Sequence, residues 1–144
     1  MVQELAPTRP DPTLEYDVTD AASGIPARVT ILGGVIAVAQ AGALRVSSNL
    51  SGDPQAPMGF WVPGTQPVPH GPDPLIIAEL SLSQVGVYHP QSMAIARMHG
   101  VGNVQAQVAA DARRGGHRFV WVSFTCIGAE NMVLRYRVTL YRPR

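Results

Sequence analysis

The fold class is decided by the last quarter of the chain, residues 117–144, which reads HRFVWVSFTCI, GAEN and MVLRYRVTLYRPR in turn. The final segment alternates strictly. One side carries Met132, Leu134, Tyr136, Val138 and Leu140, and the other side carries Val133, Arg135, Arg137, Thr139 and Tyr141. A period of two residues is typical of a β-strand with one face in a core. Phe119 to Ile127 is apolar on both faces, which indicates a central strand that is covered on both sides.

Residues 128–131 join these two segments and read GAEN, a composition suited to a short turn. The two segments are therefore predicted to pair with each other as a long β-hairpin. The rest of the chain must bring further strands to this hairpin.

Further strands are predicted from the same alternation upstream, at 14–18, 75–88 and 104–111. The β-branched run from Ala27 is predicted to form strands at 28–32, 35–39 and 43–48, the first two merging if Gly33 and Gly34 form a bulge. A buried helix over 34–44 is the alternative for part of this run. Short strands are also predicted at 58–62 and 92–98.

Short strands with turn signals every eight to twelve residues predict an all-β fold, specifically a single-domain β-sandwich of jelly-roll type, with a small closed barrel as the alternative. Pro7, Pro10 and Pro12 block helix and ladder pairing, so residues 1–13 are predicted to form an extended, proline-rich N-terminal arm. Residues 14–144 are predicted to form the β-sandwich domain, with a long loop rich in proline and glycine at 49–74.

Composition describes a globular chain of 144 residues with 46% hydrophobic and only 15% charged residues. Such a thin coat of charge suggests that part of the surface is covered by a partner. The single cysteine, Cys126, excludes a disulfide framework and a cysteine-based zinc site. No secretory signal is evident and the apolar run 29–44 is too short for a membrane span. The chain is expected to be soluble and made in a cytoplasm, with its final location open, incorporation into a particle included.

Charge is unevenly distributed along the chain. Residues 1–53 carry six acids and three arginines, whereas residues 97–144 carry eight arginines and two acids. The basic end is interpreted as a solvated face, a contact between subunits, or a site for a polyanion. A net charge of only +1 and the lack of a basic helix or RNA-binding motif argue against nucleic acid. The candidate interface residues are Arg113, Arg114, Arg135, Arg137, Arg142, Tyr141, Pro7, Pro10 and Pro12.

No catalytic or metal-binding signature is found in the sequence. The four histidines show no ligand spacing, no nucleophile accompanies His70 and Asp73, and phosphate or dinucleotide loops are missing. Neither a cofactor nor a metal is predicted. The candidate ligand-binding residues are the aromatic Phe60, Trp61 and Tyr88, for which packing in the core is the competing interpretation.

The sequence thus favours a non-enzymatic structural or interaction protein. It would self-associate as a homo-oligomer or decorate a larger assembly such as a virion or shell, by analogy of fold alone. One alternative is a small β-barrel enzyme, such as a cyclase or isomerase, whose apolar cavity uses Glu79, His99 or Tyr88. The other is a carbohydrate-binding module centred on Trp61.

Overall fold

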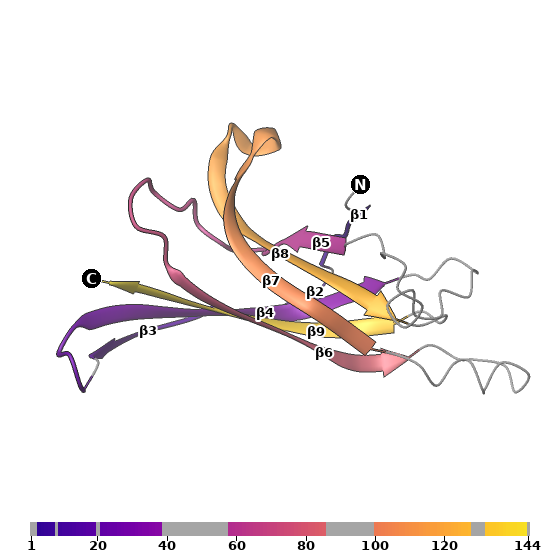
Figure 1. Ribbon diagram of the computed structural model, residues 1–144, viewed down its shortest axis with the longest axis horizontal. Coiled ribbons are helices and arrows are strands. Elements are labelled where there is room, and N and C mark those ends of the chain that lie inside the picture. The colour runs from indigo at the N-terminus through magenta and orange to yellow at the C-terminus, as the bar shows by residue number, and fades with distance from the viewer. Residues whose placement is uncertain are drawn as a thin grey trace, which may run out of the picture.

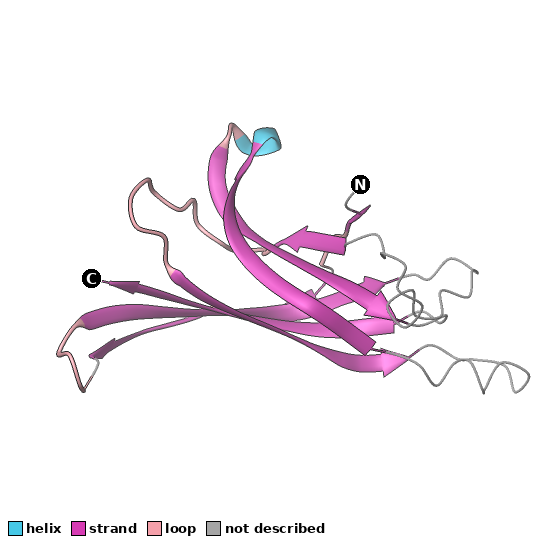
Figure 2. Cartoon of the chain, in the orientation of Figure 1, coloured by secondary structure: helices cyan, strands magenta, loops and turns pink. Residues whose placement is uncertain are grey.

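The computed structural model describes residues 3–7, 9–19, 21–38, 58–85, 100–127 and 132–143. Within these residues nearly everything is β-strand, arranged as two mainly antiparallel sheets that face each other (Figures 1 and 2). The all-β prediction is confirmed. In the described ranges, one 3₁₀ turn, Ala112–Arg114, interrupts the strands.

Sheet B is built around two long strands, β4 (Pro26–Val38) and β9 (Met132–Pro143), which pair without interruption over their whole lengths. The strand β6 (Leu75–Val85) pairs with the other side of β9. The free side of β4 is covered by β2 (Arg9–Pro10) and β3 (Leu14–Thr19). Sheet B therefore runs from β3 through β4 and β9 to β6.

Sheet A contains β5 (Met58–Trp61), β7 (Gly100–Asp111) and β8 (His117–Ile127), with β8 in the middle. The two-residue strand β1 (Gln3–Glu4) adds to the edge of β5 in parallel. The hairpin between β7 and β8 passes through the 3₁₀ turn, and Gly115 and Gly116 have positive φ angles of 71° and 76°, a conformation that glycine adopts at little cost. The far end of this hairpin curls away from sheet B, whereas β7 and β6 lie close together (Figure 1).

The core lies between the facing surfaces of the two sheets. Sheet A contributes the fully buried Phe60, Val120, Val122 and Phe124, and sheet B contributes Ile36, Leu134, Tyr136, Val138 and Leu140. The Phe60 ring contacts the rings of Phe124 and Tyr136 at centroid distances of 6.2 and 5.0 Å. These side chains are the alternating residues that the sequence places on one face of each strand, so the β-sandwich is held together by that alternation.

The hairpin predicted for residues 117–144 is wrong. Both halves are strands, but β8 pairs with β5 and β7, whereas β9 pairs with β4 and β6 in the other sheet. The apolar faces of β8 and β9 thus meet across the core. Because β8 and β9 lie in facing sheets, the side chains of Phe124 and Leu134 are both buried in the core between the sheets. Two strands paired side by side in one sheet would not face each other in this way.

The N-terminal arm docks on its own chain. The Leu5 amide donates to the Gly59 carbonyl at 2.7 Å, and the Asp11 amide donates to the Gly33 carbonyl at 2.8 Å. The arm thereby pairs with an edge of both sheets. Pro10 lies opposite Gly34 within β2, so proline here does not prevent a short ladder as the sequence suggested.

Residues 26–38 form one uninterrupted strand, so neither the break at Gly33 and Gly34 nor a helix from residue 34 is present. The strands predicted near 14–18, 58–62 and 104–111 are confirmed, and the strand predicted at 75–88 is confirmed over 75–85, since residues 86–88 lie outside the described residues. The predictions for 43–48, 92–98 and the turn at 128–131 lie outside the described residues.

Candidate functional site

The outer face of sheet B carries a largely apolar surface, in which two residues, Val29 and Thr139, are themselves buried. Residues opposite each other in an antiparallel ladder share a face, and the registers align two rows across β6, β9, β4 and β3. One row is Leu75, Tyr141, Val29 and Tyr16, and the other is Ile77, Thr139, Ile31 and Leu14. We call these eight residues the sheet B patch.

Several large side chains of the sheet B patch are exposed to an unusual degree. Leu75 and Leu14 are 64% and 59% exposed, and Tyr16 and Ile77 are 48% and 44% exposed. An apolar surface that spans four strands of a small domain is typical of a site that contacts another protein. This surface is therefore the first candidate functional site.

A charged strip adjoins the sheet B patch on the same face. Arg135 Nη1 lies 2.6 Å from Asp11 Oδ2, and Arg137 Nη2 lies 3.7 Å from Glu79 Oε1. Both ion pairs join oppositely charged side chains of one chain. Acidic residues of the N-terminal arm thus pair with arginines of β9 and of the turn after β7. These ion pairs within one chain offset part of the charge difference between the two ends of the sequence.

The outer face of sheet A holds a groove of about 440 Å³ beside two tryptophans. Trp61 on β5 lies opposite Trp121 on β8, with ring centroids 5.0 Å apart and ring planes at 66°. Polar side chains lie at its border, and the lining includes Glu4, Gln107, Asp111 and Arg113. We call this the tryptophan groove.

The charges around the tryptophan groove are paired with one another. Arg113 forms an ion pair with Glu4, and Arg114 Nε donates to Asp111 Oδ2 at 2.7 Å. This hydrogen bond from Arg114 lowers the pKa of the Asp111 carboxyl below its usual value, although burial opposes the effect. The Arg114 guanidinium also stacks 3.5 Å from the centroid of the Phe119 ring and covers that side chain.

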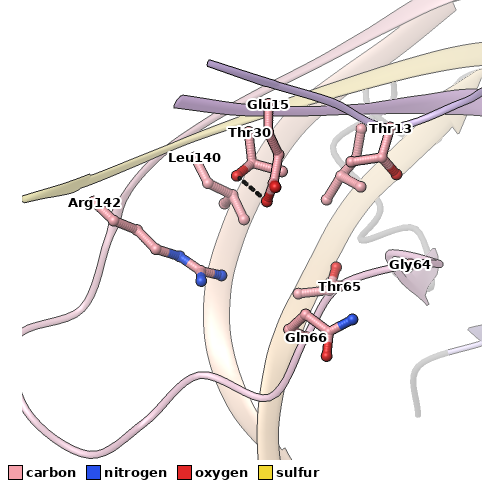
Figure 3. Close-up of a pocket in the computed structure, with 9 residues that line it drawn as sticks. Thr13, Glu15, Thr30, Gly64, Thr65, Gln66, Leu140 and Arg142 are labelled. Atoms are coloured by element: carbon pink, nitrogen blue, oxygen red, sulfur yellow. Dashed lines mark hydrogen bonds between the residues drawn. The ribbon is translucent and has the colours of Figure 1, made fainter. Parts of the chain in front are cut away.

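A smaller cleft of about 270 Å³ opens on the inner side of sheet B, where β3 and the ends of β4 and β9 face the loop after β5 (Figure 3). Thr30 Oγ1 donates to Glu15 Oε1 at 3.3 Å, and the Arg142 side chain reaches into the same space. Thr13, Thr65 and Gln66 complete the polar lining. The Nε of Arg142 is buried without a hydrogen-bond partner among the described residues.

The structure separates the site residues that the sequence proposed. Phe60 is fully buried in the core, whereas Trp61 points to the opposite side of sheet A, and Tyr88 lies outside the described residues. Among the arginines, Arg113 and Arg114 lie at the tryptophan groove, Arg135 and Arg137 form the charged strip, and Arg142 lines the cleft. Tyr141 belongs to the sheet B patch.

The three proline candidates occupy the docked arm. Pro7 is half-buried, and Pro10 and Pro12 are exposed. Of the residues proposed for an enzyme cavity, Glu79 lies on the outer face of sheet B, and His99 and Tyr88 lie outside the described residues. Asp73, considered as a partner of His70, forms an ion pair with Arg118.

Residues that sequence reasoning missed include Trp121, Gln107 and the apolar side of β3. The alternation already placed Leu14 and Tyr16 on one face of a strand, but a sequence cannot show that this face points away from the core. Alternation along β8 places Trp121 on the same face as Phe119 and Ser123, opposite the face that packs between the two sheets. That position could have identified Trp121 from the sequence.

No metal centre is evident in the described ranges, where no three histidine, cysteine, aspartate or glutamate side chains are grouped to hold an ion. In these ranges no helix has the length and apolar character needed to cross a membrane. Comparison with protein families, curated proteins and solved structures finds no match to this chain.

Proposed function

We propose that this chain is a non-enzymatic structural protein that self-associates through the sheet B patch. The observation that supports this proposal is the pair of aligned apolar rows across β6, β9, β4 and β3, with side chains as large as Leu75 and Tyr16 about half exposed or more. Burying such side chains against another apolar surface is favourable by roughly 25 cal/mol per Å². An assembly interface explains why the chain keeps them on its surface.

A second copy of the same chain is the partner that fits this surface. The charged strip beside the patch consists of ion pairs within one chain, so the surface does not call for a partner with a large charge of one sign. Two sheet B patches related by a two-fold axis would pack apolar rows on apolar rows, as sheets do inside a sandwich. Such an isologous contact closes on itself and gives a dimer.

Pairing of two copies through the exposed edge of β3 is a less favourable way to form a dimer. Glu15 and Asp17 alternate with apolar residues along β3, and antiparallel pairing of two copies would bring acids from both chains together. Like charges opposite one another destabilise a ladder. Charged edges of this kind discourage strand addition, which leaves packing between faces as the expected mode.

Light scattering of the intact chain over a range of concentrations tests the proposal. The wild type is expected to be a dimer that dissociates on dilution, and Tyr16→Arg or Ile77→Arg is expected to give monomers, because a charge would then be buried in the interface. Ile25→Arg is the matched control, since Ile25 is 55% exposed but lies in the turn between β3 and β4. A wild type that stays monomeric at all concentrations, or a dimer that persists in both patch variants, would overturn the proposal.

A further inference from the structure

We infer that the tryptophan groove on sheet A binds a neutral carbohydrate. This inference is independent of the proposed self-association, because the groove and the sheet B patch lie on opposite outer faces of the sandwich. The shape of the groove, its two aromatic rings and the ion pairs among its charged side chains support binding of such a ligand.

The aromatic rings are held in place by the fold. A Cβ atom at Gly59 would lie 2.2 Å from Cζ2 of Trp121, so the indole occupies the space that a side chain at this position would need. Trp61 contacts Trp121 edge to face, and the guanidinium of Arg114 lies 5.4 Å from the centroid of the Trp61 ring. Rings fixed on paired strands are preorganised, so little entropy is lost when a ligand stacks on them.

The surroundings of the rings fit a ligand that carries hydroxyl groups. Glu4 offers carboxylate acceptors, Arg113 offers guanidinium donors, and Gln107, exposed and opposite Trp121 in the register, offers both. A sugar ring combines C–H faces, which pack on indole, with hydroxyls at its edge. The volume of about 440 Å³ lies within the range of small-molecule sites.

The charge balance points to a neutral ligand. Each arginine near the groove, Arg113 and Arg114, is paired with a carboxylate, from Glu4 or Asp111. An acidic ligand would compete with Glu4 for Arg113, and a cationic ligand would compete with Arg113 for Glu4. A neutral sugar can accept and donate hydrogen bonds without separating these pairs.

Intrinsic fluorescence gives a direct test, because Trp61 and Trp121 are the two tryptophans of the whole chain. Cellohexaose, maltohexaose and fully N-acetylated chitohexaose, all of them neutral, are titrated separately into the intact protein, up to about 10 mM. At least one is expected to shift the emission saturably. A flat response to all three, together with no heat in calorimetry, would overturn the inference.

Variants then locate the binding, measured by calorimetry so that the loss of a tryptophan does not remove the signal. Trp61→Ala is expected to weaken binding about tenfold or more, and Gln107→Ala about fivefold. Ile25→Arg and Tyr16→Arg should bind as the wild type does, which separates this site from the sheet B patch. Unchanged affinity in Trp61→Ala, or binding of acidic polygalacturonate in place of all neutral sugars, would contradict the proposed site.

Discussion

Gly59 and Gly34 are positions where the lack of a side chain shapes the molecule. Gly59 makes room for the Trp121 indole on the outer face of sheet A. A Cβ atom at Gly34 would lie 2.6 Å from the Tyr136 hydroxyl and 2.7 Å from the carbonyl oxygen of Arg9, on the neighbouring strand β2. Each glycine therefore allows a large aromatic ring to lie against the backbone of a neighbouring strand.

Gly59→Ala is expected to destabilise the protein by about 1–3 kcal/mol, because the indole must move or the strands must separate. Denaturation in urea, followed by circular dichroism, measures the loss, and a change of tryptophan emission should accompany it. Gly102→Ala is the matched control, since the nearest atom to its Cβ would be Thr125 Oγ1 at 3.8 Å. Equal losses in the two variants would show that the Trp121 contact is not the cause.

Tyr136 is expected to limit stability at alkaline pH. Burial, with a smaller contribution from the negative charge of Asp11, raises the pKa of its phenol to about 12 from the ordinary value near 10. Because the pKa is higher in the folded state, titration of Tyr136 leaves the free energy of unfolding unchanged below about pH 10 and lowers it as the pH rises towards 12. Thermal unfolding from pH 8 to pH 12 should show this loss.

Tyr136→Phe is expected to remove that alkaline loss and to change stability at pH 7 by no more than about 1 kcal/mol. The Tyr136 hydroxyl is buried without a partner in the described part of the chain, so its removal breaks no hydrogen bond seen there. Tyr141→Phe, at a half-buried tyrosine on the outer face of sheet B, is the control and should keep the loss. If Tyr136→Phe is still destabilised above pH 10, another group is responsible.

At the scale of elements, alternation in the sequence predicts strands well and their partners poorly. The row Leu134, Tyr136 and Val138 identified β9 and its buried face, and the structure confirms both. The same pattern is equally compatible with pairing to the preceding strand or with packing across the core from it. Proximity in sequence therefore misled the assignment of β8 and β9, because pairing depends on β4 and β6, which lie far upstream.

The docked arm leads to a prediction for hydrogen exchange. The amides of Leu5 and Asp11 donate to carbonyls of Gly59 and Gly33, so both should exchange at least about tenfold more slowly than in an unstructured chain. Exchange followed by NMR under monomeric conditions measures this protection. Random-coil rates at both amides would mean that the arm is not bound to its own domain.

At the scale of the whole molecule, association through the sheet B patch should respond weakly to salt. The patch is apolar, and the neighbouring ion pairs Arg135–Asp11 and Arg137–Glu79 are already formed within one chain. Screening removes interactions between exposed charges but leaves burial of apolar surface intact. The dimer dissociation constant measured by light scattering should therefore change less than about threefold between 0.05 and 1 M sodium chloride. A dimer that dissociates in high salt would instead indicate contact between charged surfaces of two copies.

The sequence could indicate the ingredients of both candidate sites but not their assembly. Trp61 and the arginines were recognisable as residues suited to contacts, and consecutive positions already placed Phe60 and Trp61 on opposite faces of a strand. The groove needs Glu4, Trp61, Gln107 and Trp121, which are separated by as much as the length of the chain from β1 to β8. Only the three-dimensional register brings them together.

The pairing of β4 with β9 determines when sheet B can fold during synthesis. Residues 26–38 lack their long central partner until residues 132–143 have been synthesised, so sheet B cannot be completed before that segment is available. Contacts between distant parts of a chain close slowly, and all-β domains of this kind fold in milliseconds to seconds. Until β9 has been synthesised, β4 exposes Ile36 and Val38, side chains that later become fully buried, and the nascent chain is open to aggregation.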